Sequence, residues 1–468
     1  MFETVNASQA QARHWDVIIA GSSFASMFFL YGLPKDLSVL IVEKGGIQEH
    51  WDQIENQING LEEWPMSNTS GHEKEWVAHT VFGGNSNCWW GQTPRFHPDD
   101  FKLRTTAGVG EDWPISYDDL EAYYGEVETV MEISGGGNEA ILPRSTPFPF
   151  PPHIPSLSDA VLQDFDSRWF PAPSARSNGG SRANCCSNGV CHLCPIDAKF
   201  TILNASEKFT RPGVSLLHDA EIYALETSAG IVKTAEIRAG GKNVTLTADL
   251  FALGTNAVNN AVILLRSGFD NPLIGTHLHE QTSLYLKIDV PQKNYFGGTS
   301  ITGHGYQFYD NIDRSLAAAV MIENYNAPVE LRQDKDRWTE RLSLKLIAED
   351  LPQQENRILL RDDAPFIEWK GHSDYALAGL KRATDQIQSV LPWEIESLSV
   401  SDLSRTEAHI QGTTKMGTDT TNSVVNANLN YHGVPNLFVL GSGAFPSCSP
   451  ANPTLTLSAL SLRAARTI

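Results

Sequence analysis

Cysteine is scarce in this sequence, with six residues among 468. Small secreted proteins that depend on a disulfide network carry far more, so that class of protein is excluded. Four of the six nevertheless lie within ten consecutive positions, at Cys185, Cys186, Cys191 and Cys194. Such local clustering indicates a ligand site instead of a scaffold of disulfides.

Positive charge is also in short supply. The chain holds 35 Lys and Arg residues against 55 Asp and Glu residues, which gives a formal net charge of −20. No Lys/Arg-rich run is present of the kind that neutralises phosphates. The composition therefore argues against a nucleic-acid partner.

Long, unbroken apolar runs are missing as well. Residues 17–34 are close to the length of a membrane span, but they contain Gly21 and three serines, and Asp16 stands where a signal peptide carries positive charge. Residues 434–462 are interrupted by Gly441, Gly443, Pro446, Pro450 and Pro453. The sequence predicts neither a signal peptide nor insertion of this chain into a membrane.

The first chemical motif lies near the N-terminus. An apolar run at residues 16–20 predicts a buried parallel strand, the stretch GSSFAS predicts a turn, and a second apolar strand ends at Glu43. Glu43 follows Gly21 by 22 positions, which is typical of dinucleotide-binding β-α-β units. In such units the helix N-terminus holds the pyrophosphate and the carboxylate accepts the ribose hydroxyls. Ser23 and Ser26 replace the second and third glycines of the usual G-x-G-x-x-G pattern.

Two later segments, residues 249–268 and 434–465, again predict a strand, a glycine-containing turn and a helix. Strands near residues 16, 39, 249 and 437 predict a doubly wound, Rossmann-like α/β domain assembled from separated segments. The cofactor domain is assigned to residues 12–101, 181–274 and 404–468, with the cysteine loop 184–195 inserted into it. Residues 102–180 and 275–403 form a substrate domain of α+β class. Its alternating runs, such as TSLYLKIDV and RLSLKLIAE, predict an antiparallel sheet facing the cofactor.

The order of several blocks resembles the glucose-methanol-choline (GMC) family of FAD-dependent oxidoreductases. These blocks are the nucleotide turn, GGNSNCWWG, HIQGTTKMG, NLFVLGSGAFP and NPTLT. The resemblance implies FAD lying across the first sheet, with its isoalloxazine ring facing the substrate domain. The residues expected to contact FAD are Gly21, Ser22, Ser23, Phe24, Ala25, Glu43, Gly83, Gly84, Asn85, Ser86, Cys88, Gly441, Pro453 and Thr454.

Alcohol oxidation needs a base for the hydroxyl proton beside the hydride acceptor, and imidazole, with a pKa of about 6.5, suits that role. The resemblance assigns His409 as this general base and Asn452 as the residue that holds the substrate oxygen. Cys88 stands where pyranose oxidases carry a histidine bonded covalently to the flavin. A thioether bond to FAD and a buried structural cysteine are both open interpretations of Cys88.

The cysteine loop admits three interpretations from its residues alone. Four thiolates, or three with His192, would satisfy zinc; some pairing would permit a disulfide; and closely spaced cysteines followed by Pro195 are typical of iron–sulfur sites. The loop is similar to that of bacterial FAD-dependent sugar dehydrogenases. That similarity implies a 3Fe-4S or 4Fe-4S cluster on Cys185, Cys186, Cys191 and Cys194, which relays electrons from the flavin.

The implied function is oxidation of a sugar or glycoside hydroxyl to a carbonyl, with electrons passed through the cluster to an acceptor such as cytochrome c. A small partner subunit is also implied. A pyranose-oxidase-like enzyme that uses oxygen, a non-redox flavin lyase and an electron-transfer subunit are the alternatives. Relatives that reduce cytochromes can be exported folded with a partner, so the expected location is the cytoplasm or the periplasm.

Overall fold

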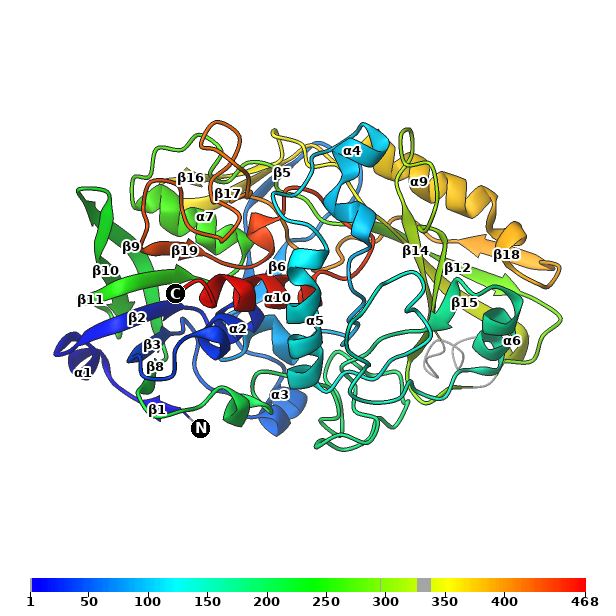
Figure 1. The fold of residues 1–468 in the computed structure, drawn as a ribbon, viewed down its shortest axis with the longest axis horizontal. Coiled ribbons are helices and arrows are strands. Elements are labelled where there is room, and N and C mark those ends of the chain that lie inside the picture. The colour runs from blue at the N-terminus through cyan, green and yellow to red at the C-terminus, as the bar shows by residue number, and fades with distance from the viewer. Residues whose placement is uncertain (1, 295, 326–337) are drawn as a thin grey trace.

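The computed structural model describes residues 2–294, 296–325 and 338–468. Its two large sheets lie toward opposite ends of the long axis of the molecule, as Figure 1 shows. The C-terminal helix and the N-terminal strands lie together at the end that holds the first sheet (Figure 1).

The first sheet is mixed and has eight strands. Its strands are, in spatial order, β1 (Glu3–Thr4), β8 (Val214–Leu217), β3 (Val39–Val42), β2 (His14–Ala20), β11 (Lys242–Leu253), β10 (Ile231–Ala239) and β9 (Ala220–Ser228), with β19 (Leu437–Val439) also paired to β11. The pairs from β1 to β11, and the pair β11–β19, are parallel, whereas β9, β10 and β11 pair antiparallel. The predicted strands near residues 16, 39, 249 and 437 are therefore brought into one sheet.

Helices pack beside the first sheet and bury its apolar residues. All four residues of β3 are buried, and α2 (Phe24–Gly32) packs against α10 (Thr454–Ala465). Gly32 permits that approach, because a Cβ atom at this position would lie 2.7 Å from the Cβ atom of Ala465. The first helix after the nucleotide turn and the last helix of the chain are thus held together.

The second sheet has six strands and is antiparallel throughout, which confirms the prediction for this part of the chain. Its order is β18 (Ser397–Val400), β12 (Thr282–Asp289), β15 (Arg341–Ala348), β14 (Val320–Tyr325), β13 (Ile301–Phe308) and β7 (Trp169–Pro171). One face is apolar, with Leu286, Ile322 and Leu344 in a buried cluster that includes Leu380 of α9 (Asp374–Asp385). The other face is turned toward the cavity described below.

The remaining α-helices and strands lie outside the two large sheets. They are α1 (Ala7–Gln11), α3 (His50–Asn56), β4 (Leu61–Glu63), β5 (Met66–Asn68), β6 (Val77–His79), α4 (Leu103–Ala107), α5 (Asp118–Met131), α6 (Leu157–Phe165), α7 (Ala257–Arg266), β16 (Arg357–Arg361) and β17 (Ala364–Trp369). Several contacts cross the predicted division of the chain: β5 pairs with β17, α5 packs against α10, and α7 packs against β16. Among the described residues, no helix combines the length and the apolar character that a membrane span requires.

Candidate flavin and substrate site

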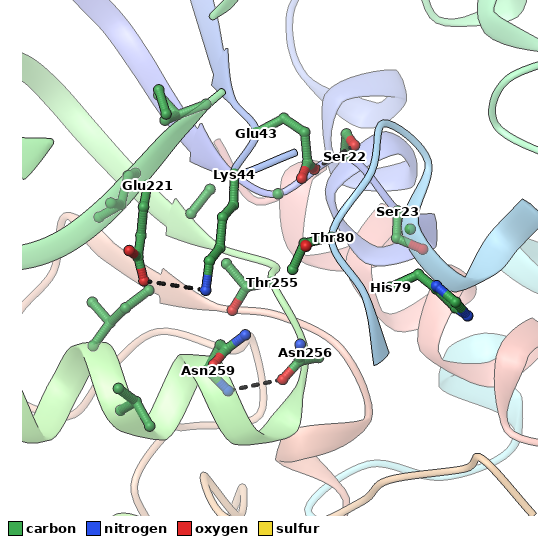
Figure 2. A pocket seen from close by; sticks show the side chains of 18 of the residues that line it. Ser22, Ser23, Glu43, Lys44, His79, Thr80, Glu221, Thr255, Asn256 and Asn259 are labelled. Carbon is green, nitrogen blue, oxygen red and sulfur yellow. Dashed lines mark hydrogen bonds and ion pairs between the residues drawn. The ribbon is translucent and has the colours of Figure 1, made fainter. Parts of the chain in front are cut away.

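The nucleotide turn follows β2 and lies at the edge of a small pocket (Figure 2). Gly21 has φ +83°, and a Cβ atom there would lie 2.8 Å from the carbonyl oxygen of Gly254. Ser26, at the third glycine position of the motif, donates from Oγ to the carbonyls of Ala20 and Gly254 at 3.1 Å each. The serine therefore joins helix and strands by hydrogen bonds, while Gly254 provides the close approach.

Glu43 lies at the end of β3 and faces Ser22 in Figure 2. Its Oε2 accepts a hydrogen bond of 2.6 Å from Ser22 Oγ, and its Oε1 accepts one of 2.9 Å from the backbone N–H of Gly45. Burial raises the pKa of the Glu43 carboxyl to about 7. Gly83 N–H donates to Ser22 Oγ at 2.8 Å, so the predicted turn and the predicted glycine pair meet at one hydroxyl.

The opposite side of this pocket comes from α7, which the sequence analysis did not assign to the site. Asn256 is the N-cap of this helix, and its Oδ1 accepts from the backbone N–H of Asn259 at 2.8 Å, as Figure 2 shows. Lys44 reaches across to Glu221 at 3.5 Å (Figure 2). The turn at residues 254–256 was recognised in the sequence, but nothing in its composition indicated that it would face Glu43.

A larger cavity of about 460 Å³ adjoins the turn and extends to the second sheet. It collects most of the predicted residues: Ser23, Phe24, Ala25, Gly84, Asn85, Cys88, His409, Gly441, Asn452, Pro453 and Thr454. Gly83 and Ser86 are buried and do not line the cavity. Ser86 is buried and accepts a hydrogen bond of 3.1 Å from Ile202 N–H, so it braces the loop without lining the cavity.

His409 is held by the two residues just before β12. Its Nδ1 lies 3.2 Å from Oε1 of Gln281, and its backbone N–H donates to Oε2 of Glu280 at 3.1 Å. Glu280 is fully buried and forms an ion pair with Lys74. The loop that carries His409 is therefore fixed to the second sheet through a buried carboxylate.

The hydrogen bonds of Gln281 determine which nitrogen of His409 carries the proton. Gln281 Nε2 donates to the carbonyls of Ser449 and Ala451 at 2.9 Å each, so its Oε1 is an acceptor. His409 Nδ1 must then be the donor in the neutral ring, which leaves the lone pair on Nε2. Burial lowers the pKa of His409 below its usual 6.5, so the neutral ring predominates at pH 7.

Asn452 also lines the cavity, one residue after Ala451, whose carbonyl is held by Gln281. Its Oδ1 is buried and has no hydrogen-bond partner among the described residues. A buried amide oxygen without a partner is costly unless a ligand satisfies it. The two predicted catalytic residues thus share one cavity and are connected through the same glutamine.

Cys88 lies at the cavity wall with its Sγ 3.5 Å from the carbonyl of Asn85. Burial raises the pKa of the Cys88 thiol, so the neutral thiol is favoured at pH 7. A neutral thiol is a poor nucleophile. This environment favours the interpretation of Cys88 as a buried structural cysteine.

The cysteine loop does not assemble the predicted metal site. The Sγ atoms of Cys185 and Cys191 lie 3.4 Å and 2.8 Å from Thr299 and Ser300 hydroxyls, respectively. Cys194 Sγ instead accepts from the backbone N–H of Ala198. All six cysteines are free, which also removes the disulfide, and within the described ranges no three His, Cys, Asp or Glu side chains converge as metal ligands.

The prediction of a cluster on Cys185, Cys186, Cys191 and Cys194 is therefore corrected for this structure. Close spacing along the chain cannot determine where thiols point in a loop with several turns, here with Ser187 at φ +52° and Gly189 at φ +78°. Cys186 is exposed, whereas Cys191 and Cys194 are buried. As placed, the four sulfurs do not fit a cluster or a zinc ion.

Two buried cations tie this loop to the cavity wall. Lys199 Nζ donates to the carbonyls of Asn87, Trp89, Cys191 and His192 at 2.6–3.0 Å, and burial lowers its pKa to about 8. Arg176, also buried, donates to the carbonyl of Trp90 at 2.9 Å and lies 3.6 Å from the sulfur of Cys191. Neither cation forms an ion pair with a described carboxylate. The sequence analysis missed both, because a lone Lys or Arg carries no signal of burial.

These features suit a dinucleotide cofactor whose reactive end lies against a base. The close backbone approach at Gly21, the carboxylate of Glu43 and the start of α2 offer the contacts that a ribose and a pyrophosphate require. The larger cavity provides space next to His409 and the unpartnered Asn452. The fold and the site together suit a protein that binds a dinucleotide cofactor beside a histidine base.

Comparison with known proteins finds one matching family model and several similar proteins. Residues 331–461 match the family model described as GMC oxidoreductase. The chain is 26% identical to the fructose dehydrogenase large subunit of Gluconobacter japonicus, over 97% of both chains. It is 27% identical to the 6'''-hydroxyparomomycin C oxidase of Streptomyces lividus, over 97% of this chain and 91% of that protein.

The fold agrees with this assignment. The solved structure of pyridoxine 4-oxidase from Mesorbium loti superposes with a TM-score of 0.69 at 17% identity, covering 97% of this chain and 99% of that one. Residues 331–461 therefore match the GMC oxidoreductases, and the chain is similar over nearly its whole length to dehydrogenases and oxidases. The resemblance found in the sequence is confirmed.

Proposed function

We propose that this protein oxidises a hydroxyl of a sugar or glycoside to a carbonyl. The observation that carries the proposal is the hydrogen bond between His409 Nδ1 and Gln281 Oε1, which leaves His409 Nε2 as a free base in the cavity. Bound FAD supplies the hydride acceptor. His409 takes the hydroxyl proton at Nε2, and the amide of Asn452 holds the substrate oxygen in place.

The residues expected to hold FAD fall into two groups. Gly21, Ser22 and Glu43 would bind the ribose and the pyrophosphate from the small pocket. Phe24, Gly441 and Thr454 line the larger cavity, on the side where the reactive ring would lie. The larger cavity would accommodate the ring between the two sheets, on the side where His409 lies.

A sugar or glycoside substrate is favoured by two considerations. The relatives include a protein named for fructose and two oxidases named for paromomycin-type compounds. The cavity also has polar side chains on the wall formed by the second sheet, including Tyr285 and Lys345. A polyhydroxylated substrate can satisfy such groups, whereas a purely apolar alcohol cannot.

Two electron acceptors are candidates: an external acceptor and oxygen. Relatives named as a dehydrogenase subunit favour an external acceptor such as cytochrome c and a partner subunit, and relatives named as oxidases favour oxygen. No step is assigned to an iron–sulfur cluster, because the cysteine sulfurs do not converge. Iron and acid-labile sulfide analysis of the purified protein, together with peroxide formation in air, separates the two.

The oxidation itself is tested by anaerobic titration of the FAD-loaded protein with a panel of sugars, glycosides and simple alcohols. Bleaching of the flavin absorbance by sugars supports the proposal. No bleaching by any alcohol, with FAD stoichiometrically bound, would contradict it and favour a flavin lyase or an electron-transfer subunit.

A further inference from the structure

Four side chains form a row across neighbouring strands of the second sheet. In the strand register Tyr285 of β12 lies opposite Lys345 of β15, Lys345 lies opposite Glu323 of β14, and Glu323 lies opposite His304 of β13. Directly paired residues on one face of a sheet are within contact distance of one another. The four therefore form a continuous polar band, here called the polar row.

The polar row stands on the face of the sheet that is turned to the cavity. Tyr285, Glu323 and Lys345 all line the cavity that holds His409. Their neighbours along the strands, such as Leu284, Ile322 and Leu344, belong to the apolar cluster on the other face. This alternation places charged residues in a buried position, which is costly unless each has a partner.

Lys345 has an ion-pair partner, whereas one carboxyl oxygen of Glu323 has no hydrogen bond within the described part of the chain. The Lys345 ammonium lies 2.6 Å from a carboxylate oxygen of Glu407, two residues before His409. Glu323 Oε1 is buried and has no hydrogen-bond partner among the described residues. Lys345 and the Tyr325 hydroxyl are nearby and favour the carboxylate. His304 Nε2 lies 3.8 Å from Glu323 Oε1, but burial lowers the pKa of His304 to about 3, so that ring is neutral.

We propose that Glu323 is a substrate-recognition residue, whose carboxylate accepts a hydrogen bond from a donor group on the non-reacting part of the substrate. This inference rests on the proposed function, because it concerns the same cavity and the same substrate. Glu323 thus selects compounds that carry a second hydroxyl or an ammonium group at a fixed distance from the carbon whose hydroxyl proton His409 removes. A monofunctional alcohol leaves this carboxylate without a partner and is disfavoured.

The polar row also couples recognition to the base. Lys345 lies between Glu323 and Glu407, and Glu407 belongs to the loop that presents His409. The Lys345–Glu407 pair is electrically neutral. Burial raises the pKa of Glu323, and a hydrogen-bond donor on the substrate favours its carboxylate form. Glu323 can accept a hydrogen bond from the hydroxyl of a neutral sugar or from the ammonium of an amino sugar. The experiment below distinguishes the two donors.

The test uses the full FAD-loaded chain and two substitutions, Glu323→Leu and Glu323→Gln. The apparent dissociation constant and the limiting rate are taken from the saturation of anaerobic flavin reduction by glucose, fructose, glucosamine and their single deoxy analogues. We expect Glu323→Leu to raise the dissociation constant roughly tenfold or more for an accepted sugar, because a charge-assisted hydrogen bond is lost. The limiting rate should change much less.

One deoxy position identifies the donor. The analogue that lacks the group bound by Glu323 should bind the unmodified protein and Glu323→Leu equally well. Glu323→Gln keeps an acceptor oxygen and should retain much of the affinity for a hydroxyl donor, but it should lose as much as Glu323→Leu for an ammonium donor. Equal effects on the whole deoxy series in both variants would overturn the inference.

Asp289→Asn is the matched control. Asp289 lies on β12 of the same sheet, pairs with Arg341 at 2.7 Å and does not line the cavity, so its change should leave the sugar dissociation constants unaltered. FAD content and melting temperature of each variant show whether the fold is kept. If no sugar reduces the flavin of the unmodified protein, the proposed function fails; if sugars do and Glu323 variants bind them unchanged, only this inference fails.

Discussion

His409 and Gln281 form the contact that makes the histidine a base. The distance between His409 Nδ1 and Gln281 Oε1 is 3.2 Å, and the amide nitrogen of Gln281 is committed to two carbonyls of the segment that precedes Asn452. One glutamine therefore fixes the tautomer of the base and the position of its catalytic neighbour. Neither role could be anticipated from a lone glutamine in the sequence.

Replacing Gln281 tests this positioning role. Gln281→Leu removes the acceptor for Nδ1–H, so the tautomer with a free Nε2 is no longer enforced and the anaerobic rate of flavin reduction should fall roughly 10- to 100-fold. FAD content should stay unchanged, since Gln281 does not line either cofactor pocket. A full rate with an unaltered pH profile would contradict the assignment.

The pH dependence of the reductive step follows from the state of His409. Burial lowers its pKa below 6.5, and the carboxylates of Glu407 and Glu280 partly oppose that effect. The neutral ring is the active form, so the limiting rate should be constant above pH 6.5 and fall as the pH drops through the lowered pKa. Stopped-flow flavin reduction between pH 4.5 and 9 measures this limb.

Glu407→Gln should move that limb to lower pH. The change removes a negative charge that raises the pKa of His409 and leaves the positive charge of Lys345 unpaired, and both effects favour the neutral ring. An acid limb that moves to higher pH would show that the electrostatic assignment is wrong. Asp289→Asn, whose carboxylate lies outside the cavity, should leave the limb where it is.

Much of the fold could be predicted because the relevant signals are local. Hydrophobic periodicity and turn residues predict a strand wherever they occur together in the sequence. This holds for the apolar run before Gly21, for the strand that ends at Glu43 and for the alternating strands of the second sheet. The glycine motif was harder to interpret, since Ser26 stands at its third position. The structure shows that Gly254, from a strand more than 200 residues later, gives the close approach that the motif needs.

The site was predicted where a family motif spans it and missed where partners come from distant strands. His409 and Asn452 were found, but Gln281, Glu323 and Lys345 depend on the register of an antiparallel sheet. The cysteine loop shows the opposite error. Its spacing suggested convergence, yet the thiols take separate partners such as Ser300, because loop turns set their directions.

Glu43 gives a prediction for cofactor binding. Burial raises its pKa from 4.5 to about 7 in the FAD-free protein, and the ribose hydroxyls bind best to the carboxylate form. FAD binding should then release a proton, so affinity should rise with pH by up to about tenfold per unit below pH 7 and level off above it. Fluorescence titration of apoprotein with FAD measures this, and Glu43→Gln should flatten the dependence; an unchanged slope would contradict it.

A buried ion network under the second sheet gives a prediction for stability. Arg314 Nη1 lies 2.9 Å from Asp100 Oδ1, and the same guanidinium pairs with Glu349. Arg314→Met leaves two buried carboxylates without their cation and should cost about 3–5 kcal/mol in the free energy of unfolding. The partly exposed pair of Arg168 with Asp166 is the control, because Arg168→Met should cost only about 1 kcal/mol or less by urea unfolding. Equal costs for the two variants would contradict this role.

The central claim is that His409 is the base of an FAD-dependent alcohol oxidation. The most direct test is anaerobic, stopped-flow reduction of the bound flavin in His409→Ala by a sugar that reduces the unmodified protein. The account predicts normal FAD content and a rate of flavin bleaching lower by at least about 100-fold. Bleaching at the unmodified rate would contradict it.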